Sequence, residues 1–382
     1  MPILVRQNEW ALVGLTSVTR SGQSAVRRGG FRLALTILGG MTTPKRAAAI
    51  TDDPLSDEKI AAVRSGLLGW FSANARDLPW RRTRDPYAIL VSEVMLQQTQ
   101  VDRVIPYYER WLERFPNVTA LAEAATADVI TAWAGLGYNR RAVNLQRTAR
   151  FVVEECDGIF PSDVERLLTL PGIGPYTAGA IAAFAFEQDA AFIDTNMRRV
   201  LHRVTFGPDV PDQLRHDREV IPVARQLVPP GQGWGWNQAL IEFGALQCTA
   251  RKPACLICPL QSVCTAYPAI LGALASVPKG SRKKVEAPFA GSNRFYRGRI
   301  IDLLRTAPSS GLSLEEVGQA VRPDFSDIDH TWVHGIVSGL ARDGLAVVEW
   351  SVAESAPGYS TDGVASSAIP NDGLATLRVR LP

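Results

Sequence analysis

Four cysteines stand close together, at a spacing that could hold a metal centre. Cys248, Cys255, Cys258 and Cys264 fall within 17 residues, whereas Cys156 stands alone. We expect Cys156 to be a small buried hydrophobe. Four thiolates can hold either a zinc ion or an iron–sulfur cluster. Because the four cysteines are clustered, they predict a metal centre rather than disulfides. The array has one C-x2-C pair rather than the two of the usual zinc pattern, but these residues alone leave both metals open.

A second stretch, LPGIGPYTA at 170–178, could bind a phosphate group. Gly172 and Gly174 lie between two segments of helical pattern, where glycine permits a tight turn and leaves backbone N–H groups bare. Those N–H groups, together with the positive end of the following helix, would form a site for a DNA phosphate. The alternative is a plain turn between two helices.

Two carboxylates could do acid–base and electrostatic chemistry. Asp194 follows the apolar run AFI and begins a basic helix, so its spacing alone would allow it to be only an N-cap. Glu93 lies in an apolar helix beside Val94, and an acid in such surroundings tends to have a raised pKa and to stay protonated at neutral pH. Taken alone, it could also be a surface glutamate of an amphipathic helix.

These three motifs and the stretch LPWRRTRDPYAILVSEVMLQQTQ at 78–100 resemble, in order, the MutY-type adenine DNA glycosylases of the helix-hairpin-helix, endonuclease III superfamily. The resemblance covers about residues 56–268 and includes the cysteine spacing residue for residue. It implies one [4Fe–4S] cluster held by the four cysteines and two helical lobes with a DNA groove between them. It also implies that the substrate is double-stranded DNA, in which adenine mispaired with 8-oxoguanine or guanine is released by hydrolysis of its N-glycosidic bond.

The resemblance assigns the chemistry to four residues. Glu93 would be the general acid and then the general base, and Asp194 would stabilise the oxocarbenium ion or attack it transiently. Tyr176 would hydrogen-bond near both acids, and Asn196 belongs to the same catalytic group. Endonuclease III has a lysine where this chain has Tyr176, and a phenol cannot form the imine on which strong lyase activity depends.

The resemblance also implies a set of residues that contact DNA or the flipped base. Leu96 and Gln98 would fill the gap that the flipped base leaves, and Tyr138 would intercalate. Trp80, Arg81 and Glu242 are candidates for the adenine pocket. The whole set is Trp80, Arg81, Leu96, Gln97, Gln98, Tyr138, Gly172, Gly174 and Glu242. The sequence Gly-Tyr-Asn at 137–139 departs from the family's more usual Gly-Tyr-Tyr, which leaves the role of Asn139 open.

The elements that must position these residues are predicted to be mostly helices. Apolar residues recur at helical spacing through 56–268, and Asp85-Pro86 marks a helix start. We divide the chain into a leader or start-site extension (1–50), a glycosylase region (51–268), a linker (269–288) and a small module (289–382). Within the glycosylase region, 84–190 would be the six-helix barrel lobe, and 51–83 would join 191–268 in the cluster lobe.

The module has a helical pattern followed by the strand-like LAVVEW at 345–350, which would fit a winged-helix-like fold. A loop is expected at 351–372. The module does not resemble the MutT-related domain with which typical MutY proteins read 8-oxoguanine. Selectivity for the base opposite adenine is therefore open.

Composition adds only broad limits. The chain has 382 residues, a net charge of +3 and 46% hydrophobic residues, as a globular protein of two or three domains would. Without an apolar run of about 18 residues, no membrane span is expected. We expect a cytoplasmic, nucleoid-associated monomer. Two alternatives are a bifunctional glycosylase/AP lyase like endonuclease III and a non-catalytic DNA-binding or redox-sensing cluster protein.

Overall fold

The structure is a computed structural model that describes residues 55–276, 289–352 and 375–382. The predicted leader lies outside the described residues. Within the described residues, no helix has both the length and the hydrophobicity needed to span a bilayer.

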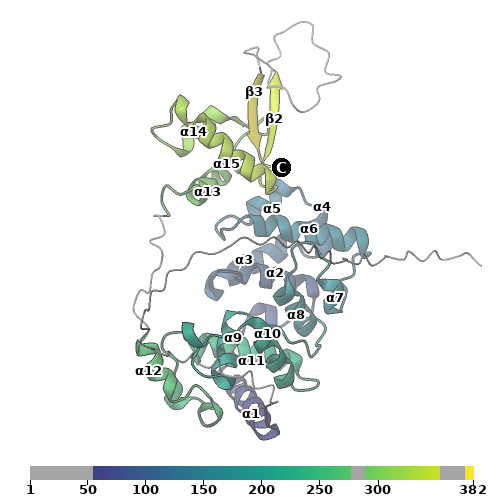
Figure 1. Cartoon of the computed structure of the whole chain (residues 1–382). Coiled ribbons are helices and arrows are strands. Elements are labelled where there is room, and N and C mark those ends of the chain that lie inside the picture. The colour runs from purple at the N-terminus through teal and green to yellow at the C-terminus, as the bar shows by residue number, and fades with distance from the viewer. Residues whose placement is uncertain (1–54, 277–288, 353–374) are drawn as a thin grey trace, which may run out of the picture. The chain divides into compact units, whose positions relative to one another are not determined.

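The glycosylase region is built from helices, and 55–276 contain no strand (Figure 1). This confirms the prediction of a mostly helical fold. The α-helices are α1 (Asp57–Asn74), α2 (Pro86–Leu96), α3 (Val101–Arg114), α4 (Val118–Glu123), α5 (Thr126–Ala132), α6 (Arg140–Glu155), α7 (Val164–Leu167), α8 (Pro175–Phe184), α9 (Thr195–Thr205), α10 (Asp217–Leu227), α11 (Gly233–Leu246) and α12 (Ala269–Ser276). Four 3-10 turns join them: η1 (Pro79–Arg81), η2 (Pro211–Gln213), η3 (Cys255–Ile257) and η4 (Gln261–Val263).

Helix α2 is the central helix of the barrel lobe. Its predicted start is confirmed, because the Asp85 side chain accepts hydrogen bonds from the N–H groups of Tyr87 at 3.0 Å and Ala88 at 3.3 Å. Every residue from Tyr87 to Met95 is buried. The helix packs against α3, α6 and α8, so it is apolar all round rather than on one stripe.

The first helix packs with helices from the other end of the region. Helix α1 contacts α10 and α11, and α11 in turn contacts α9. The buried side chains of α1 are Ile60, Val63 and Leu67, which recur at helical spacing on one face. Helix α1 therefore lies with the elements that follow Asp194 in the sequence.

The predicted linker begins too early. Residues 269–276 form α12, in which Ile270 is buried and donates its backbone N–H to the carbonyl of Ala266 at 2.8 Å. The apolar run AILGALA favours a helix that packs on the cluster lobe over an exposed linker. The rest of the predicted linker, 277–288, lies outside the described residues.

The C-terminal module combines three helices with a small sheet. Its elements are α13 (Asn293–Leu304), β1 (Leu312–Ser313), α14 (Leu314–Val321), η5 (Asp327–Asp329), α15 (His330–Arg342), β2 (Val347–Val352) and β3 (Ala375–Arg380). The strands are antiparallel in the order β1-β3-β2, with Val379 opposite both Leu312 and Val348. The winged-helix assignment stays a prediction. The loop predicted at 351–372 begins two residues too early, because 351 and 352 belong to β2, and the rest of it is not described.

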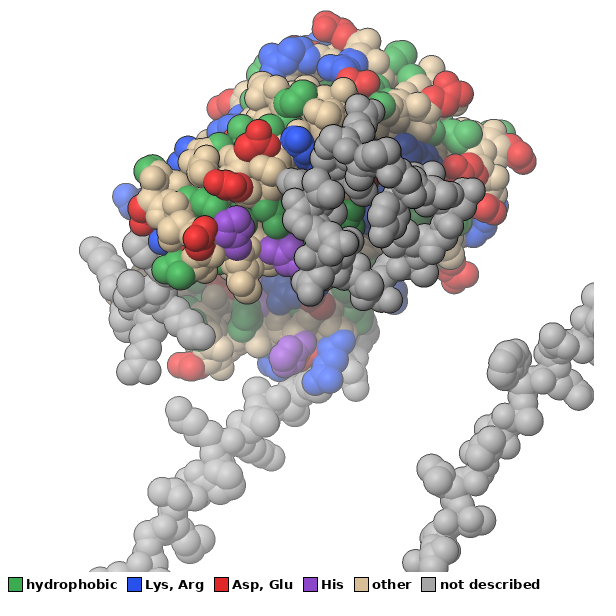
Figure 2. Space-filling view, turned by 90° about the horizontal axis from the view of Figure 1, so that it is seen from above, with side chains coloured by type: hydrophobic (Ala, Val, Ile, Leu, Met, Phe, Trp, Pro, Cys, Tyr) green, Lys and Arg blue, Asp and Glu red, His purple; other side chains and the backbone are tan. Residues whose placement is uncertain are grey.

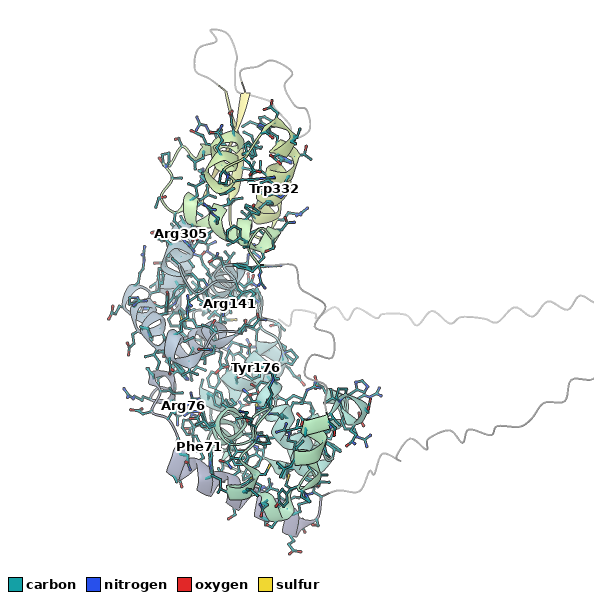
Figure 3. All side chains as sticks on the ribbon, turned by 90° about the vertical axis from the view of Figure 1, so that its left-hand side faces the viewer. Phe71, Arg76, Arg141, Tyr176, Arg305 and Trp332 are labelled. Atoms are coloured by element: carbon teal, nitrogen blue, oxygen red, sulfur yellow. The ribbon has the colours of Figure 1, made fainter. Side chains whose placement is uncertain are left out.

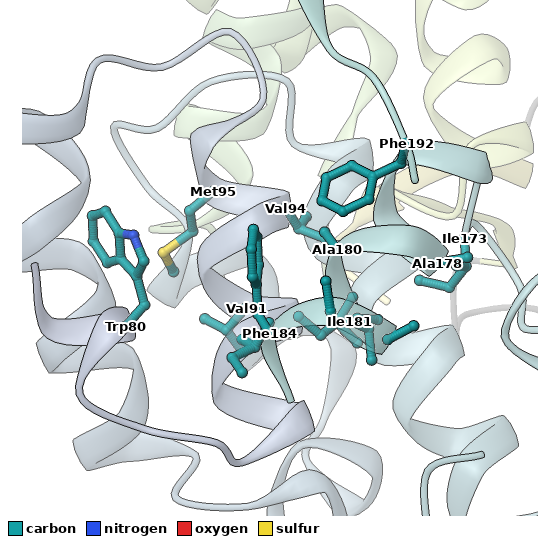
Figure 4. Packing of buried hydrophobic residues seen from close by; sticks show 14 of the residues in the cluster. Trp80, Val91, Val94, Met95, Ile173, Ala178, Ala180, Ile181, Phe184 and Phe192 are labelled. Carbon is teal, nitrogen blue, oxygen red and sulfur yellow. The ribbon is translucent and has the colours of Figure 1, made fainter. Parts of the chain in front are cut away.

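Helix α8 approaches the segment before α9 very closely, as Figure 4 shows for Phe192 beside α8. A Cβ atom on Gly179 would lie only 2.6 Å from the Cβ of Phe192. Phe192 is 3% exposed and packs edge to face on Tyr176, with 5.4 Å between ring centroids. The missing side chain at 179 thus lets the segment that leads to Asp194 lie against the helix that carries Tyr176.

We predict that Gly179→Ala lowers the free energy of unfolding by about 1–3 kcal/mol, because the new methyl group overpacks this contact. Gly69→Ala is the matched control, since Gly69 lies on the exposed side of α1 with open space around its Cβ position. That change should stabilise the protein by up to about 1 kcal/mol through helix propensity. Urea unfolding measures both, and equal shifts of the two midpoints would contradict the packing argument.

Candidate active site and cluster loop

Glu93 is a buried acid whose surroundings favour its neutral form. It lies on α2 and is 6% exposed. Burial raises the pKa of Glu93 to about 7; a hydrogen bond with Tyr176 opposes this, and the charge of Asp194 adds to it. A carboxyl group that titrates near neutral pH can both donate and accept a proton under cellular conditions.

Asp194 is at once the N-cap of α9 and a neighbour of Glu93. Its Oδ1 accepts the backbone N–H of Met197 at 2.7 Å, and its Oδ2 accepts the side-chain amide of Asn196 at 3.3 Å. Burial raises the pKa of Asp194, and the hydrogen bonds from Met197 and Asn196 oppose that rise. The positive end of α9 also favours the carboxylate form. The carboxylate that caps α9 is therefore also the charged group beside Glu93.

Tyr176 joins the two acids. It is the second residue of α8, and burial raises the pKa of its phenol well above the ordinary value, as do the charges of Glu93 and Asp194. The phenol therefore stays protonated and hydrogen-bonds with Glu93. The structure thus brings Glu93, Tyr176 and Asp194 together, as predicted from helices far apart in the sequence, with Asn196 directly behind Asp194.

The glycine-rich turn before α8 has the form expected of a hairpin. Gly172 has φ = 81°, and a Cβ there would also lie 3.3 Å from Asn144. By contrast, Gly174 has φ = −98° with open space around its Cβ position, so nothing in the described protein requires a glycine there. This open side is where a ligand could approach the N-terminus of α8. Binding of a phosphate here stays a prediction.

The predicted wedge residues lie on two exposed turns. Leu96 ends α2, and Gln97 and Gln98 after it are exposed. Tyr138, on the turn before α6, is 49% exposed. Gln98 and Tyr138 have φ values of 58° and 48°, in the left-handed region that side chains other than glycine rarely adopt. Strained backbone of this kind clusters at functional sites, which favours a role for both turns.

Arg141 ties these two turns together, and the sequence analysis missed it. Its Nη1 donates to the carbonyls of Val94 at 2.8 Å and Gln97 at 2.6 Å. Its Nη2 donates to Leu136 and Gly137, each at 3.2 Å. The only hint of this role in the sequence was its position three residues after Tyr138. That position does not distinguish Arg141 from its neighbour Arg140.

Arg81 and Glu242, predicted for an adenine pocket, lie in a buried ion-pair network. The Glu242 side chain is 0% exposed and accepts from Arg76 at 2.7 Å and from Arg81 at 3.0 Å. Burial alone would raise the pKa of Glu242, but the hydrogen bonds from Arg76 and Arg81 outweigh it and lower the pKa to about 2. The network joins the segment after α1 to α11. A contact with adenine stays a prediction for both residues.

Trp80, the third pocket candidate, lies in the core. It is 6% exposed and packs edge to face on Tyr108 at 5.5 Å between ring centroids. Figure 4 shows it across from Met95 of α2. Most of its surface is therefore used in packing, and its contact with a base stays a prediction.

The four cysteines of the array line one small pocket. Cys248, Cys255, Cys258 and Cys264 border it together with apolar side chains such as Phe243 and Leu260. Among the described residues, no three His, Cys, Asp or Glu side chains meet closely enough to hold a single metal ion. Four thiols around a common space are the ligand set that an iron–sulfur cluster needs.

A buried arginine, Arg203, stabilises the cluster loop. Arg203 donates to the Sγ of Cys248 at 3.5 Å and to the carbonyls of Thr249 at 2.7 Å and Ala250 at 3.0 Å. Burial raises the pKa of the Cys258 thiol to about 11, and it also raises the pKa of the Cys248 thiol, where the charge of Arg203 opposes the rise. Positive charge from bound iron would favour the thiolate forms. The residues present therefore fit an iron–sulfur cluster.

Arg199 connects the cluster loop with the acid site. Its Nε donates to the carbonyl of Cys248 at 2.7 Å, and its Nη2 donates to the Oδ1 of Asn196 at 2.9 Å. Asn196, so oriented, donates to Asp194. The sequence analysis missed Arg199, which it treated only as part of a basic helix.

Comparison with known proteins agrees with this geometry. The family described as HhH-GPD superfamily base excision DNA repair protein matches residues 91–222, and the iron-sulfur binding domain of endonuclease III matches residues 248–264. The adenine DNA glycosylase of Mycolicibacterium smegmatis is 43% identical over 254 residues, which are 66% of this chain and 84% of that protein. The chain belongs to the adenine DNA glycosylase family.

In other relatives the similarity covers about half of this chain. The human adenine DNA glycosylase is 45% identical over 218 residues, 54% of this chain but only 40% of its own length. A solved structure of a thermostable thymine-DNA glycosylase superposes with a TM-score of 0.52 at 31% identity and covers 55% of this chain and 97% of its own. As an adenine DNA glycosylase, the chain is a DNA N-glycosylase of base excision repair, and it carries one [4Fe–4S] cluster held by its cluster loop.

Glu242→Gln should lower the free energy of unfolding at pH 7 by about 3 kcal/mol, because Arg76 and Arg81 lose their buried anion. Since the folded pKa of about 2 lies below the ordinary 4.5, this contribution is full above 4.5 and is lost as the pH falls toward 2. The difference between variant and wild type should therefore shrink in acid. Urea unfolding at several pH values measures it.

Glu349→Gln provides the control for that experiment. Glu349 pairs with Arg380 at 2.8 Å, but both side chains are more than a third exposed. Such a pair contributes at most about 1 kcal/mol. An equal loss in both variants would show that the Glu242 network has no special weight.

Proposed function

We propose that this glycosylase removes adenine paired with 8-oxoguanine or guanine, with Glu93 as general acid and base and Asp194 as the stabiliser of the sugar cation. The observation that carries the proposal is that Glu93, a carboxyl with a pKa of about 7, hydrogen-bonds with a protonated phenol and feels the charge of a capped carboxylate. Two acids whose surroundings push them toward different protonation states can divide the labour of a glycosidase.

In the first step, Glu93 gives its proton to N7 of the flipped adenine. The C1′–N9 bond then breaks with its electron pair going to the base, which leaves as neutral adenine. Positive charge develops on the sugar at C1′ and O4′. Asp194 stabilises this charge, either electrostatically or by transient bonding to C1′. Because both acids lie in a site largely shielded from water, their electrostatic effect is stronger than in solvent.

In the second step, Glu93 is a carboxylate and takes a proton from water as the oxygen attacks C1′. The product is an abasic site, and Glu93 regains its proton. Tyr176 holds the Glu93 carboxyl in place through its hydrogen bond. Asn196 holds Asp194 in the same way. The cluster supplies no step of this reaction; it stabilises the loop that Arg199 links to Asn196.

The two exposed turns carry the side chains that offset the free-energy cost of base flipping. Rotating a nucleotide out of the duplex costs a few kcal/mol of stacking and pairing, and side chains inserted into the stack offset this cost. We infer that Leu96 and Gln98 on one turn and Tyr138 on the other do so, with Gln97 beside Leu96 and Gln98. Gly172 and Gly174 would hold a backbone phosphate.

Single-turnover adenine release from duplexes with A opposite 8-oxoguanine, G or T tests this proposal. We expect release opposite 8-oxoguanine and G. Glu93→Gln and Asp194→Asn should each lower the rate by at least about 10²-fold while binding to the duplex is largely kept. The wild-type rate should fall as the pH rises above about 7, because Glu93 then loses its proton. Wild-type rates in either variant would overturn the assignment.

Tyr176→Lys tests the separation from a lyase. A lysine amine at this position of the hairpin could attack C1′ and form an imine, which the phenol cannot do. We expect the variant to give an adduct trapped by borohydride, measured as a band of slower migration, whereas the wild type gives none. Trapping by the wild type would instead favour the bifunctional glycosylase/lyase, and trapping by neither would contradict the position proposed for residue 176.

A further inference from the structure

One pocket lies outside the acid site, at the contact between the glycosylase region and the C-terminal module. Its volume is about 520 Å³. One wall is the turn with Tyr138 and the start of α6, and the other is the segment from Phe289 into α13. Figure 3 shows Arg305 where the module meets the barrel lobe, with Arg141 nearby.

The charged residues of this pocket are arginines. Arg140, Arg141, Arg294 and Arg297 all line it, and no acidic side chain does. Nearby, Asp343 pairs with Arg297 and, at 3.4 Å, with Arg140. On the face that Figure 2 shows, acidic and basic side chains are interspersed. The pocket is therefore a local site of positive charge.

Arg294 is the cation of the pocket that is best placed to meet a ligand. It is exposed, and among the described residues no carboxylate pairs with it. Its guanidinium lies 4.9 Å from the ring centroid of Phe289 and 6.0 Å from that of Tyr138. Cation–π contacts of this kind hold a guanidinium in position without neutralising its charge. Phe289 and Tyr138 are themselves about half exposed, so the group sits at an open rim.

The two walls are fixed to each other by a buried contact. The Arg305 side chain, 9% exposed, donates from Nη2 to the carbonyl of Ile130 at 3.1 Å and to the Oδ1 of Asn139 at 3.2 Å. Ile130 and Val143 of the glycosylase region share one hydrophobic cluster with the module. Asn139 thus has a structural role, because its hydrogen bond with Arg305 ties the turn that carries Tyr138 to the module.

We propose that this pocket binds a phosphate of the DNA backbone next to Tyr138, so that the C-terminal module extends the DNA-binding surface of the glycosylase. Arg294 is the main contact, and Arg140 and Arg297 add charge. The N-termini of α6 and α13 both lie at the pocket and add the positive ends of two helices. The inference rests on the proposed function in one respect, which is that Tyr138 faces the DNA.

The test is the salt dependence of binding to an undamaged duplex and to one with A opposite 8-oxoguanine. Losing one phosphate contact should reduce the slope of log affinity against log salt by about 0.9, which is about eightfold in affinity between 1 M and 0.1 M salt. We expect this for Arg294→Gln. Arg299→Gln is the matched control, because Arg299 is exposed on the same helix but does not line the pocket. Its slope should equal that of the wild type.

A second measurement locates the phosphate. In a series of duplexes, each with one neutral methylphosphonate, one position should weaken wild-type binding and leave Arg294→Gln unaffected. Equal slopes for wild type and Arg294→Gln, an equal loss in Arg299→Gln, or the absence of such a position would overturn the inference. A wild-type protein that shows the Arg294-dependent slope but releases no adenine would instead contradict the proposed function alone.

Discussion

The site depends on the burial of one carboxyl group. Glu93 lies in a helix that is packed on every side, and no cation in the described part of the chain pairs with it, so its neutral form is favoured. Glu242 is as deeply buried, yet two guanidinium groups lower its pKa to about 2. The same residue type is thus a proton donor in one place and a permanent anion in the other, and only the neighbours differ. The proposed chemistry needs the first environment.

The rest of the glycosylase region brings groups to that carboxyl. Gly179 lets the segment with Phe192 lie against α8, which places Asp194 beside Tyr176. Behind Asp194, Asn196 and Arg199 form a chain of hydrogen bonds that ends at the carbonyl of Cys248. The cluster loop is therefore linked to the acid site through the side chains of α9.

Arginines that anchor backbone carbonyls are a second recurring device. Arg141 holds the two exposed turns, and Arg305 holds the Tyr138 turn from the module. Turns with left-handed residues such as Gln98 and Tyr138 store strain, so they need contacts of this kind to keep one conformation. A guanidinium group suits the task because its several donors reach carbonyls of more than one segment.

The sequence by itself determined the helical class, the start of α2, the cysteine array and the residues of the acid site, because these depend on local spacing and on motifs that resemble a family. Only the tertiary structure decided which charges meet. Arg141, Arg199 and Arg305 look like any surface arginine in the sequence, since most of their partners are carbonyls and amides remote in the chain. The start of the linker moved for a related reason: the apolar run in α12 indicated a packed helix only when the structure showed a surface that buries Ile270.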